Sequence, residues 1–449
     1  MDRLPTLLAV DLQTEQRLLF VLVQLVIILL AARAFAALGR LLWQPTAVGE
    51  IAAGLVLGPS VLGRLAPEFS ARLFDESTLP LLGMLSQLGL VLFLFLVGLE
   101  FDFGHLRWHG RAAFAISLSG IVLPFGLGLG LGLLLHPHLE RPVAAEGFIL
   151  FMGIALSITA LPVLGRIMLE LGITRTRLGT VTITAAAVDD ACGWVLLAAV
   201  AGVVQANFDP WLTVRMAGLT VLFVLGLVLV VRPLMRRWIR TALIGADGQL
   251  GLTEMAVILC VLFGCAVATS LIGIFALFGA FLFGAVLADE PGFRKAVSGR
   301  LRDFVTAFFV PIFFTSTGLR TDIGSLETGG QWLLGGLVLL AAVAGKFGGC
   351  TLAARLGGFG WREAGCVGAM MNTRGLMELV VVNVGLDLGV IPPSVFCMLV
   401  LMALLTTAMA TPLLLGLMRG TELEPFIRQS GFIRGPKAPA VLPGDKREP

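Results

Sequence analysis

Residues 180–204 read TVTITAAAVDDACGWVLLAAVAGVV, and this stretch decides the fold. It contains two adjacent carboxylates, Asp189 and Asp190, and no other charged side chain. As a helix it is long enough to cross the roughly 30 Å hydrocarbon core of a bilayer. One acidic side chain near the centre of a spanning helix costs about 2.5–3.5 kcal/mol on insertion scales, so a purely structural helix would avoid two. The stretch therefore predicts a membrane helix whose aspartates carry the function.

Composition places the rest of the chain in a membrane as well. The chain is 57% hydrophobic and 14% charged, and its mean hydropathy is +0.95. These values exclude an ordinary soluble domain and are typical of a polytopic membrane protein in a lipid bilayer. A net charge of +3, with basic residues scattered over short loops, argues against a nucleic-acid partner. The six cysteines lie in apolar stretches and indicate buried side chains, so we expect no disulfide framework and no cofactor.

Hydropathy predicts an all-α polytopic membrane protein with about 13 transmembrane helices. They are expected at residues 18–39, 44–62, 80–100, 111–135, 145–171, 177–204, 211–239, 251–271, 272–289, 302–320, 330–355, 362–386 and 393–419. Residues 1–17 precede them, and the charged, proline-rich residues 420–449 are expected to form a disordered tail. Lys and Arg gather in the loops of one side, which predicts an outside N-terminus and a cytoplasmic C-terminus. We expect a bacterial inner (plasma) membrane location.

Two pairs of similar strings predict an internal repeat. LVLFLFLVGLEFDFG (90–104) resembles VPIFFTSTGLRTDIG (310–324), and GLVLGPS (54–60) resembles GAVLADE (284–290). An offset of seven predicted helices turns the second copy upside down. The sequence therefore predicts two inverted six-helix repeats, 18–204 and 251–419, joined by one linking helix within 205–250, as in many secondary transporters.

Each predicted repeat contains a broken crossing helix. SITALP (157–162) places a proline in mid-span, and Pro162 removes a backbone donor and clashes with the preceding turn. NTRG (372–375) interrupts an apolar run at nearly the same depth. A packing kink is the alternative, but matched positions in inverted copies favour a substrate site at the midplane. The side chains expected to support the breaks are Ser157, Pro162, Asn372, Thr373, Arg374 and Glu378.

The intramembrane charges need partners. Asp189 and Asp190 point about 100° apart on a helix, so we expect one to face the bundle interior and the other a cavity. Lys346, in AAVAGKFGGC, is a candidate counter-charge, and both a structural salt bridge and direct participation in transport remain open. Arg374 and Glu378 are four residues apart and are expected to form an ion pair that braces the second broken helix.

Four strings resemble the monovalent cation:proton antiporters, which include plant cation/H+ exchangers and bacterial Kef-type potassium efflux systems. They are QPTAVGEIAAGLVLGPSVLG (44–63), SITALPVLGRIMLELGI (157–173), AAAVDDACGW (185–194) and MNTRGLMELVVVNVG (371–385). The resemblance implies a sodium/proton-antiporter-like fold, normally a homodimer, in which a core bundle with the broken helices moves against a dimerisation panel.

The resemblance also implies roles for single residues. Asp190 matches the essential aspartate that binds the transported alkali cation and the proton, and Asp189 matches the variable position before it. Lys346 matches a basic residue that pairs with an aspartate, and Thr159 lies at the first helix crossing. Asp189, Thr159 and carbonyl groups of the broken helices are expected to help Asp190 hold the cation. Na+ or K+ would then exchange for H+ by alternating access, because cation and proton compete for one carboxylate.

Three other functions are weighed against antiport. Kef-type K+ efflux, by K+/H+ antiport or a channel-like route, is the main alternative, although Kef proteins usually carry Gln-Asp and append a nucleotide-binding domain. An intramembrane aspartyl enzyme needs two carboxylates that flank one water, which adjacent helical residues cannot do, so we expect no enzymatic activity. A sodium-coupled organic-solute carrier fits the architecture less well than antiport fits the aspartate pair.

Overall fold

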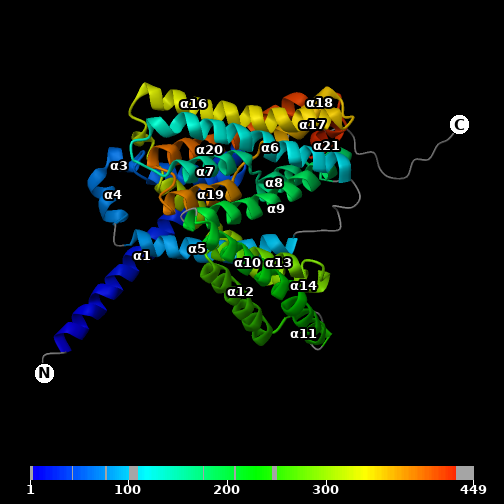
Figure 1. Ribbon diagram of the computed structural model, residues 1–449. Coiled ribbons are helices and arrows are strands. Elements are labelled where there is room, and N and C mark those ends of the chain that lie inside the picture. The colour runs from blue at the N-terminus through cyan, green and yellow to red at the C-terminus, as the bar shows by residue number, and fades with distance from the viewer. Residues whose placement is uncertain are drawn as a thin grey trace.

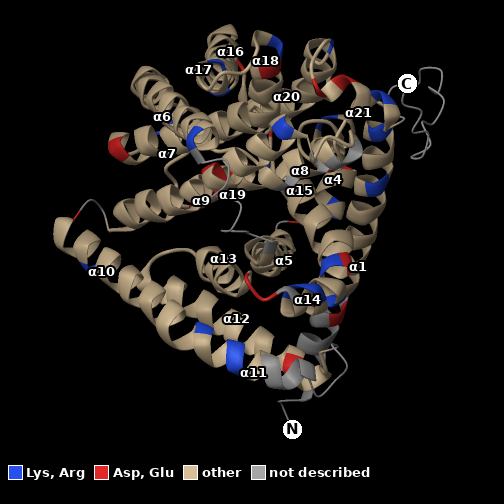
Figure 2. Ribbon diagram, turned by 90° about the vertical axis from the view of Figure 1, so that its right-hand side faces the viewer, with Lys and Arg blue, Asp and Glu red and all other residues tan. Residues whose placement is uncertain are grey.

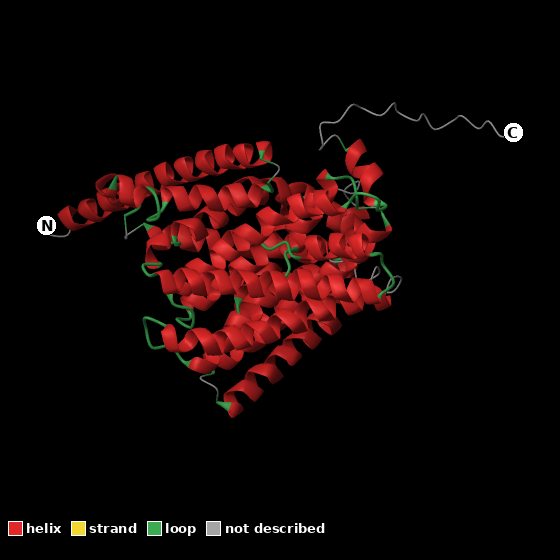
Figure 3. Ribbon diagram, turned by 90° about the horizontal axis from the view of Figure 1, so that it is seen from above, coloured by secondary structure: helices red, strands yellow, loops and turns green. Residues whose placement is uncertain are grey.

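Helices make up almost all of the described chain. The structure, a computed structural model, describes residues 4–42, 44–75, 78–100, 110–174, 176–206, 209–244 and 250–430, and no strand occurs among them (Figures 1 and 3). The first half contains α1 (Leu4–Leu41), α2 (Thr46–Leu57), α3 (Leu62–Leu65), α4 (Pro67–Leu73), α5 (Leu79–Glu100), α6 (Gly110–Leu135), α7 (Ala145–Ser157), α8 (Leu161–Glu170) and α9 (Arg177–Gln205).

In the second half of the chain, three pairs of consecutive helices are joined by a π-helical turn. Its helices are α10 (Pro210–Gly226), α11 (Arg232–Ile244), α12 (Leu252–Ile272), α13 (Ala276–Leu287), α14 (Pro291–Phe304), α15 (Val310–Leu319), α16 (Gly329–Val343), α17 (Gly349–Leu356), α18 (Trp361–Met371), α19 (Leu376–Asp387), α20 (Pro393–Leu417) and α21 (Leu423–Gln429). Single π-helical turns, Leu227–Val231, Val305–Phe309 and Ala344–Gly348, join α10 to α11, α14 to α15 and α16 to α17.

The described chain is that of an integral, multi-pass membrane protein. Ten of its helical segments are long and apolar enough to cross a membrane. The other three predicted spans fall on shorter helices: 272–289 on α13, 145–171 on α7 and α8, and 362–386 on α18 and α19. The all-α class is confirmed, whereas the number thirteen stays a prediction.

The helices form two groups, which pack on each other where α9 contacts α10, α20 contacts α2 and α19 contacts α15. Figures 1 and 2 show α6 to α9 with α16 to α20 in one group, here called the core bundle, and α5 with α10 to α14 in the other. Helices α2 and α15 pack against each other, and α15 also packs on α5, so α2 and α15 belong with the second group, here called the panel. In Figure 2 most of the spanning helical surface is neither acidic nor basic, as hydrocarbon requires.

The strings that predicted the repeat meet each other across the panel. A Cβ atom added to Gly54 of α2 would lie 2.2 Å from the Thr315 carbonyl oxygen of α15. A Cβ atom added to Gly284 of α13 would lie 2.2 Å from the Phe95 carbonyl oxygen of α5. Each close contact therefore joins a helix of one copy to a helix of the other, and the two contacts are equivalent. This reciprocity supports the inverted repeat, which stays a prediction.

Both broken helices exist, but Pro162 does not break the first one. The chain leaves helical conformation at residues 158–160 and again at 372–375, and Ile158 is extended. Pro162 is instead the second residue of α8, in the first turn, where a missing N–H leaves no intrahelical bond unmade. The prediction of a proline break was therefore wrong in its cause, because Pro162 lies in the first turn of the second half-helix, after the irregular residues 158–160.

The ends of the chain also differ from expectation. Helix α1 begins at Leu4, within the segment 1–17 that was set apart from the first span. Residues 423–429 of the predicted disordered tail form α21, whose Leu423 and Ile427 are fully buried. Glu422, just before it, accepts a hydrogen bond from the Leu178 backbone nitrogen at 2.5 Å. Four-residue spacing of two apolar side chains thus docks this segment on the bundle; residues 431–449 lie outside the described chain.

Candidate functional site

The two broken stretches hydrogen-bond directly to each other. The Ala160 backbone nitrogen donates to the Thr373 carbonyl oxygen at 3.2 Å, and the Thr159 hydroxyl donates to the Met371 carbonyl oxygen at 3.3 Å. Both residues 159 and 373 are fully buried. Backbone groups without a helical partner thus form hydrogen bonds across the two broken stretches. This makes irregular backbone possible inside a membrane protein. Segments 212 residues apart in sequence therefore form one crossing.

The hydroxyls of Ser157 and Thr373 do not face a ligand. Ser157 Oγ donates to the Ile154 carbonyl oxygen at 2.9 Å, and Thr373 Oγ1 donates to the Met370 carbonyl oxygen at 2.8 Å. Each hydroxyl therefore closes the last turn of its own half-helix. These two predicted support residues act at helix ends, in equivalent ways in α7 and α18.

Two basic side chains from the second half cap the carboxyl end of α7. The last carbonyl groups of a helix have no intrahelical donors, and the helix dipole adds partial negative charge there. Arg374 donates from Nη1 to the Ala155 oxygen at 2.8 Å and from Nη2 to the Leu156 oxygen at 2.7 Å. Lys346 Nζ donates to the Ser157 oxygen. Three successive carbonyl groups are thus satisfied by cations.

Lys346 is fully buried in the π-helical turn between α16 and α17. Its Nζ lies 2.7 Å from Asp189 Oδ2 and 2.8 Å from the Gly120 carbonyl oxygen, besides its bond to Ser157. All three ammonium protons therefore have acceptors. Lys346 forms its ion pair with Asp189 and therefore does not neutralise the charge of Asp190.

The second predicted ion pair is also present. Arg374 Nη1 lies 3.1 Å from Glu378 Oε2, and both side chains are almost completely buried. Thr407 of α20 holds the backbone at the same point: its Oγ1 accepts from the Arg374 nitrogen at 2.9 Å and donates to the Arg374 oxygen at 2.5 Å. Sequence reasoning did not select Thr407, because a hydroxyl within an apolar span is a weak signal on its own.

Asp190 remains as the uncompensated charge at the crossing. It is 2% exposed and, within the described chain, takes part in no ion pair, whereas Asp189 is fully buried against Lys346. Asp189 therefore faces the bundle interior, as one of the two was expected to do. The charges of Lys346 and Asp189 cancel, and those of Arg374 and Glu378 cancel, so the ionised site carries the charge of Asp190 alone.

Polar atoms without partners lie at the same crossing. Neither the amide oxygen nor the amide nitrogen of Asn372, a fully buried residue, has a hydrogen-bond partner among the described residues, and the same holds for Asp189 Oδ1. Buried polar groups in native proteins are almost always satisfied by protein, water or an ion. The crossing thus provides oxygen atoms, the ligand type that hard cations prefer.

Two cavities lie between the panel and the core bundle. The larger, about 350 Å³, lies between α5, α13, α15 and α19 and is lined by polar as well as apolar groups, among them Gln87 and Thr317. A much smaller cavity shares Phe275 and Leu277 with it and reaches Trp194. Trp194 follows Asp190 by four residues and so lies on the same side of α9. The smaller cavity therefore lies on the side of α9 that carries Asp190, although Asp190 lines neither cavity.

An ion pair between the panel and the core bundle lies at the larger cavity. Arg320 Nη2, just after α15, is 2.5 Å from Asp387 Oδ1 at the end of α19. Arg320 Nη1 also donates to Asn383 Oδ1 at 3.0 Å, and Asn383 Nδ2 donates to Thr317 Oγ1 at 3.1 Å. All four residues line this cavity. Sequence reasoning did not select them, because a charge at a span end usually lies at the interface.

The fold and the site define a membrane protein of secondary-transporter architecture, with broken helices that cross at the bundle centre. The chain belongs to the sodium/hydrogen exchanger family, whose transmembrane model matches residues 25–417. It is similar to Cation/H(+) antiporter 18 of Arabidopsis thaliana, with 37% identity over 395 residues that make up 88% of this chain and 48% of the relative.

Two further proteins extend this comparison. Na(+)/H(+) antiporter NhaS4 of Synechocystis sp. is 38% identical over 398 residues, which cover 88% of this chain and 96% of the relative. The chain thus spans about half the length of the plant relative but nearly all of the cyanobacterial one. The solved sodium proton antiporter MjNhaP1 from Methanocaldococcus jannaschii shares the fold, with a TM-score of 0.60, 17% identity and coverage of 91% of this chain and 98% of that chain.

Proposed function

We propose that the protein is a secondary-active monovalent cation/proton antiporter, in which H+ and Na+ or K+ bind alternately at Asp190. One observation carries the proposal: Asp190 is buried without a basic partner, next to an aspartate that Lys346 neutralises. A structural carboxylate at this depth would itself be paired, because an uncompensated buried charge costs several kcal/mol. Asp190 therefore requires a mobile cation, and the proton is one such cation.

The charge balance explains why such a site exchanges its ligands. With a proton on Asp190 the crossing is neutral, and with a monovalent cation bound to the carboxylate it is neutral again. Only the empty, ionised site carries a net negative charge, which is unfavourable in a low-dielectric interior. Both loaded states can therefore pass from one side to the other while the empty state cannot. One cation leaves for each proton that binds.

The coordination shell follows from the unsatisfied oxygens. Asp190 supplies the charge. We assign two oxygens without hydrogen-bond partners, Asp189 Oδ1 and the Asn372 amide oxygen, as further ligands. We add the Thr159 hydroxyl, which donates to the Met371 oxygen and can still accept through its oxygen lone pairs. Alkali cations are bound by oxygen atoms that replace part of their hydration shell. These groups come from both halves of the chain, which agrees with a midplane site in an inverted repeat.

The names of the relatives agree on antiport and differ on the cation. Na(+)/H(+) antiporter NhaS4 names sodium, whereas K(+)/H(+) antiporter 1 of Saccharomyces cerevisiae, 33% identical over 378 residues, names potassium. A Kef-type K+/H+ exchange at the same site is therefore the second candidate. We also propose the domain division 18–204 and 251–419, a homodimer formed through the panel, a bacterial inner-membrane location and a cytoplasmic C-terminus.

Reconstitution in liposomes that contain a pH-sensitive dye tests the proposal. An imposed pH gradient should be dissipated when Na+, Li+ or K+ is added, and Asp190→Asn should abolish this exchange. Asp303→Asn, at an exposed position of α14, is the matched control and should exchange at the wild-type rate. Wild-type exchange by Asp190→Asn would overturn the assignment. Cation flux that moves no protons when the pH gradient is clamped to zero would instead indicate a channel-like route.

A further inference from the structure

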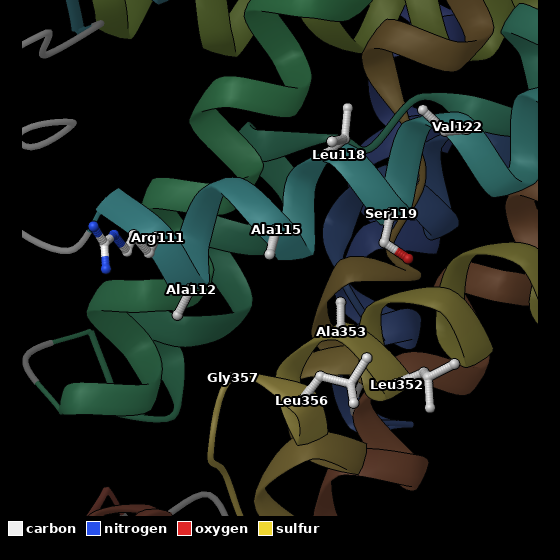
Figure 4. A pocket seen from close by; sticks show the side chains of 10 residues that line it. All are labelled: Arg111, Ala112, Ala115, Leu118, Ser119, Val122, Leu352, Ala353, Leu356 and Gly357. Carbon is white, nitrogen blue, oxygen red and sulfur yellow. The ribbon is translucent and has the colours of Figure 1, made fainter.

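A groove runs along the surface of the core bundle between α6 and α17. Its volume is about 640 Å³, and its walls are almost entirely apolar. Figure 4 shows Ala112 and Ala115 of α6 on the side towards Leu352 and Leu356 of α17, and Leu118 also lines the groove. Leu118, Leu352 and Leu356 are 49%, 55% and 81% exposed. The groove therefore opens on the outer surface of two helices that are long and apolar enough to span a membrane.

One unpaired positive charge lies at the end of this groove. Arg111 is the first residue of the span Arg111–His138, and it lies at one end of the row of lining side chains in Figure 4. On the opposite wall α17 ends at Leu356, and Gly357 completes the lining. Helix α6 thus begins where α17 ends, and lipid headgroups are expected at the ends of membrane-spanning helices. Within the described chain the exposed Arg111 guanidinium has neither a hydrogen bond nor an ion pair.

We propose that this groove binds one anionic phospholipid, with an acyl chain along α6 and α17 and the phosphate at Arg111. Hydrocarbon is the solvent at this depth, so an apolar groove open to the outside takes up an acyl chain and not water. The arginine selects the headgroup, because a basic group at the surface of a membrane helix attracts anionic lipid. The loops on this side are rich in basic residues, which agrees with the leaflet that carries anionic lipid.

The groove is lined by α6 and α17, the two helices next to Lys346: Lys346 lies in the turn before α17 and donates to Gly120 of α6. At its inner wall, Ser119 Oγ donates to the Gly349 carbonyl oxygen at 3.0 Å. The next residue on α6, Gly120, accepts a hydrogen bond from Lys346 Nζ. A bound lipid would therefore contact the closely packed segments of α6 and α17 without touching the aspartates. The lipid site does not depend on the proposed antiport and can be tested separately.

Native mass spectrometry of the purified protein tests the inference, with phosphatidylglycerol as the anionic probe and phosphatidylcholine as the zwitterionic one. Wild-type protein should retain its tightest phosphatidylglycerol about fivefold more strongly, the preference expected of one basic group near the membrane surface. Arg111→Gln should abolish this preference while still binding either lipid. Ala115→Trp fills the groove without a change in charge and should weaken the binding of both lipids.

Two matched variants control for charge and for bulk. Arg215→Gln removes an equally exposed arginine from α10, and Leu134→Trp adds an indole to α6 away from the groove. Both should bind the two lipids as wild type does. Equal retention of the two lipids by wild-type protein, or an unchanged preference in Arg111→Gln, would overturn the charge assignment. Wild-type lipid binding by Ala115→Trp would overturn the location.

Discussion

Replacement of Lys346 by Gln separates the structural role of its ion pair from transport. The change leaves Asp189 fully buried and without its counter-charge. Removal of one partner of a buried pair typically destabilises a protein by about 3–5 kcal/mol. The Gly120 and Ser157 carbonyl oxygens also lose a charged donor, although a glutamine amide can replace one of these bonds. We therefore expect the ratio of folded to unfolded protein to fall by about 10²- to 10⁴-fold.

A second change should restore most of this loss. In Lys346→Gln combined with Asp189→Asn, both partners are neutral and can hydrogen-bond as amides. The double variant should therefore be more stable than Lys346→Gln alone, and the two destabilisations should be far from additive. Such coupling is expected of residues in direct contact, here at 2.7 Å.

Thermal unfolding of the purified protein in one detergent, followed by tryptophan fluorescence, measures these differences. Lys295→Gln, at an exposed position of α14, is the matched control and should unfold at the same temperature as the wild-type protein. A Lys346→Gln protein that unfolds at the wild-type temperature would refute the reasoning. So would a double variant that is less stable than either single variant, because the ion pair could then not be the source of the stabilisation.

Three further changes test the packing, the site and the cavity. Gly284→Val places a side chain against the Phe95 carbonyl group of α5 and should lower the free energy of unfolding by about 1–3 kcal/mol or more, measured by thermal unfolding. The control Gly299→Val, where no atom of a neighbouring segment lies within 4 Å of the added Cβ, should lower it much less. Asn372→Ala should raise the cation concentration for half-maximal exchange at least about fivefold, measured with the pH dye, because one ligand is lost. Asp387→Asn breaks the half-exposed ion pair with Arg320, which is worth about 0–1 kcal/mol, so the unfolding temperature should stay near that of wild type. The same dye assay shows whether loss of this ion pair makes exchange faster.

The parts of the site that sequence could predict are those that depend on spacing along one helix. Arg374 and Glu378 are four residues apart, so their pairing follows from helix geometry alone, and the structure contains it. The break at 372–375 was visible because polar residues and glycine interrupt an apolar run. Lys346 was identified as a counter-charge by its depth in a span. The sequence did not show whether Lys346 pairs with Asp189 or Asp190, because this depends on the rotation of α9 about its own axis, on which composition carries little information.

The parts that sequence could not predict depend on contacts with backbone groups of distant segments. Nothing in residues 155–157 indicates that their carbonyl groups accept hydrogen bonds from Arg374 and Lys346, because every helix end offers the same groups. Pro162 was misread for a related reason: a proline marks a helix boundary, but it does not say on which side of the boundary the irregular segment lies. The docking of α21 likewise depends on a surface that only the folded bundle provides.

The capped end of α7 gives a reason why the proposed site uses groups from both halves of the chain. A broken helix near the midplane presents carbonyl dipoles that would themselves attract a cation, and in competition with Asp190 they would hold it elsewhere. Arg374 and Lys346 occupy those carbonyl groups from the other half of the chain. The attraction for a mobile cation is then concentrated on one carboxylate. If the Lys346–Asp189 pair stays closed, the proposed mechanism exchanges one cation for one proton in each cycle and moves no net charge, so we expect a clamped membrane voltage to leave the exchange rate unchanged. A rate that rises with voltage in liposomes would mean that this ion pair opens and that Lys346 or Asp189 carries a second proton.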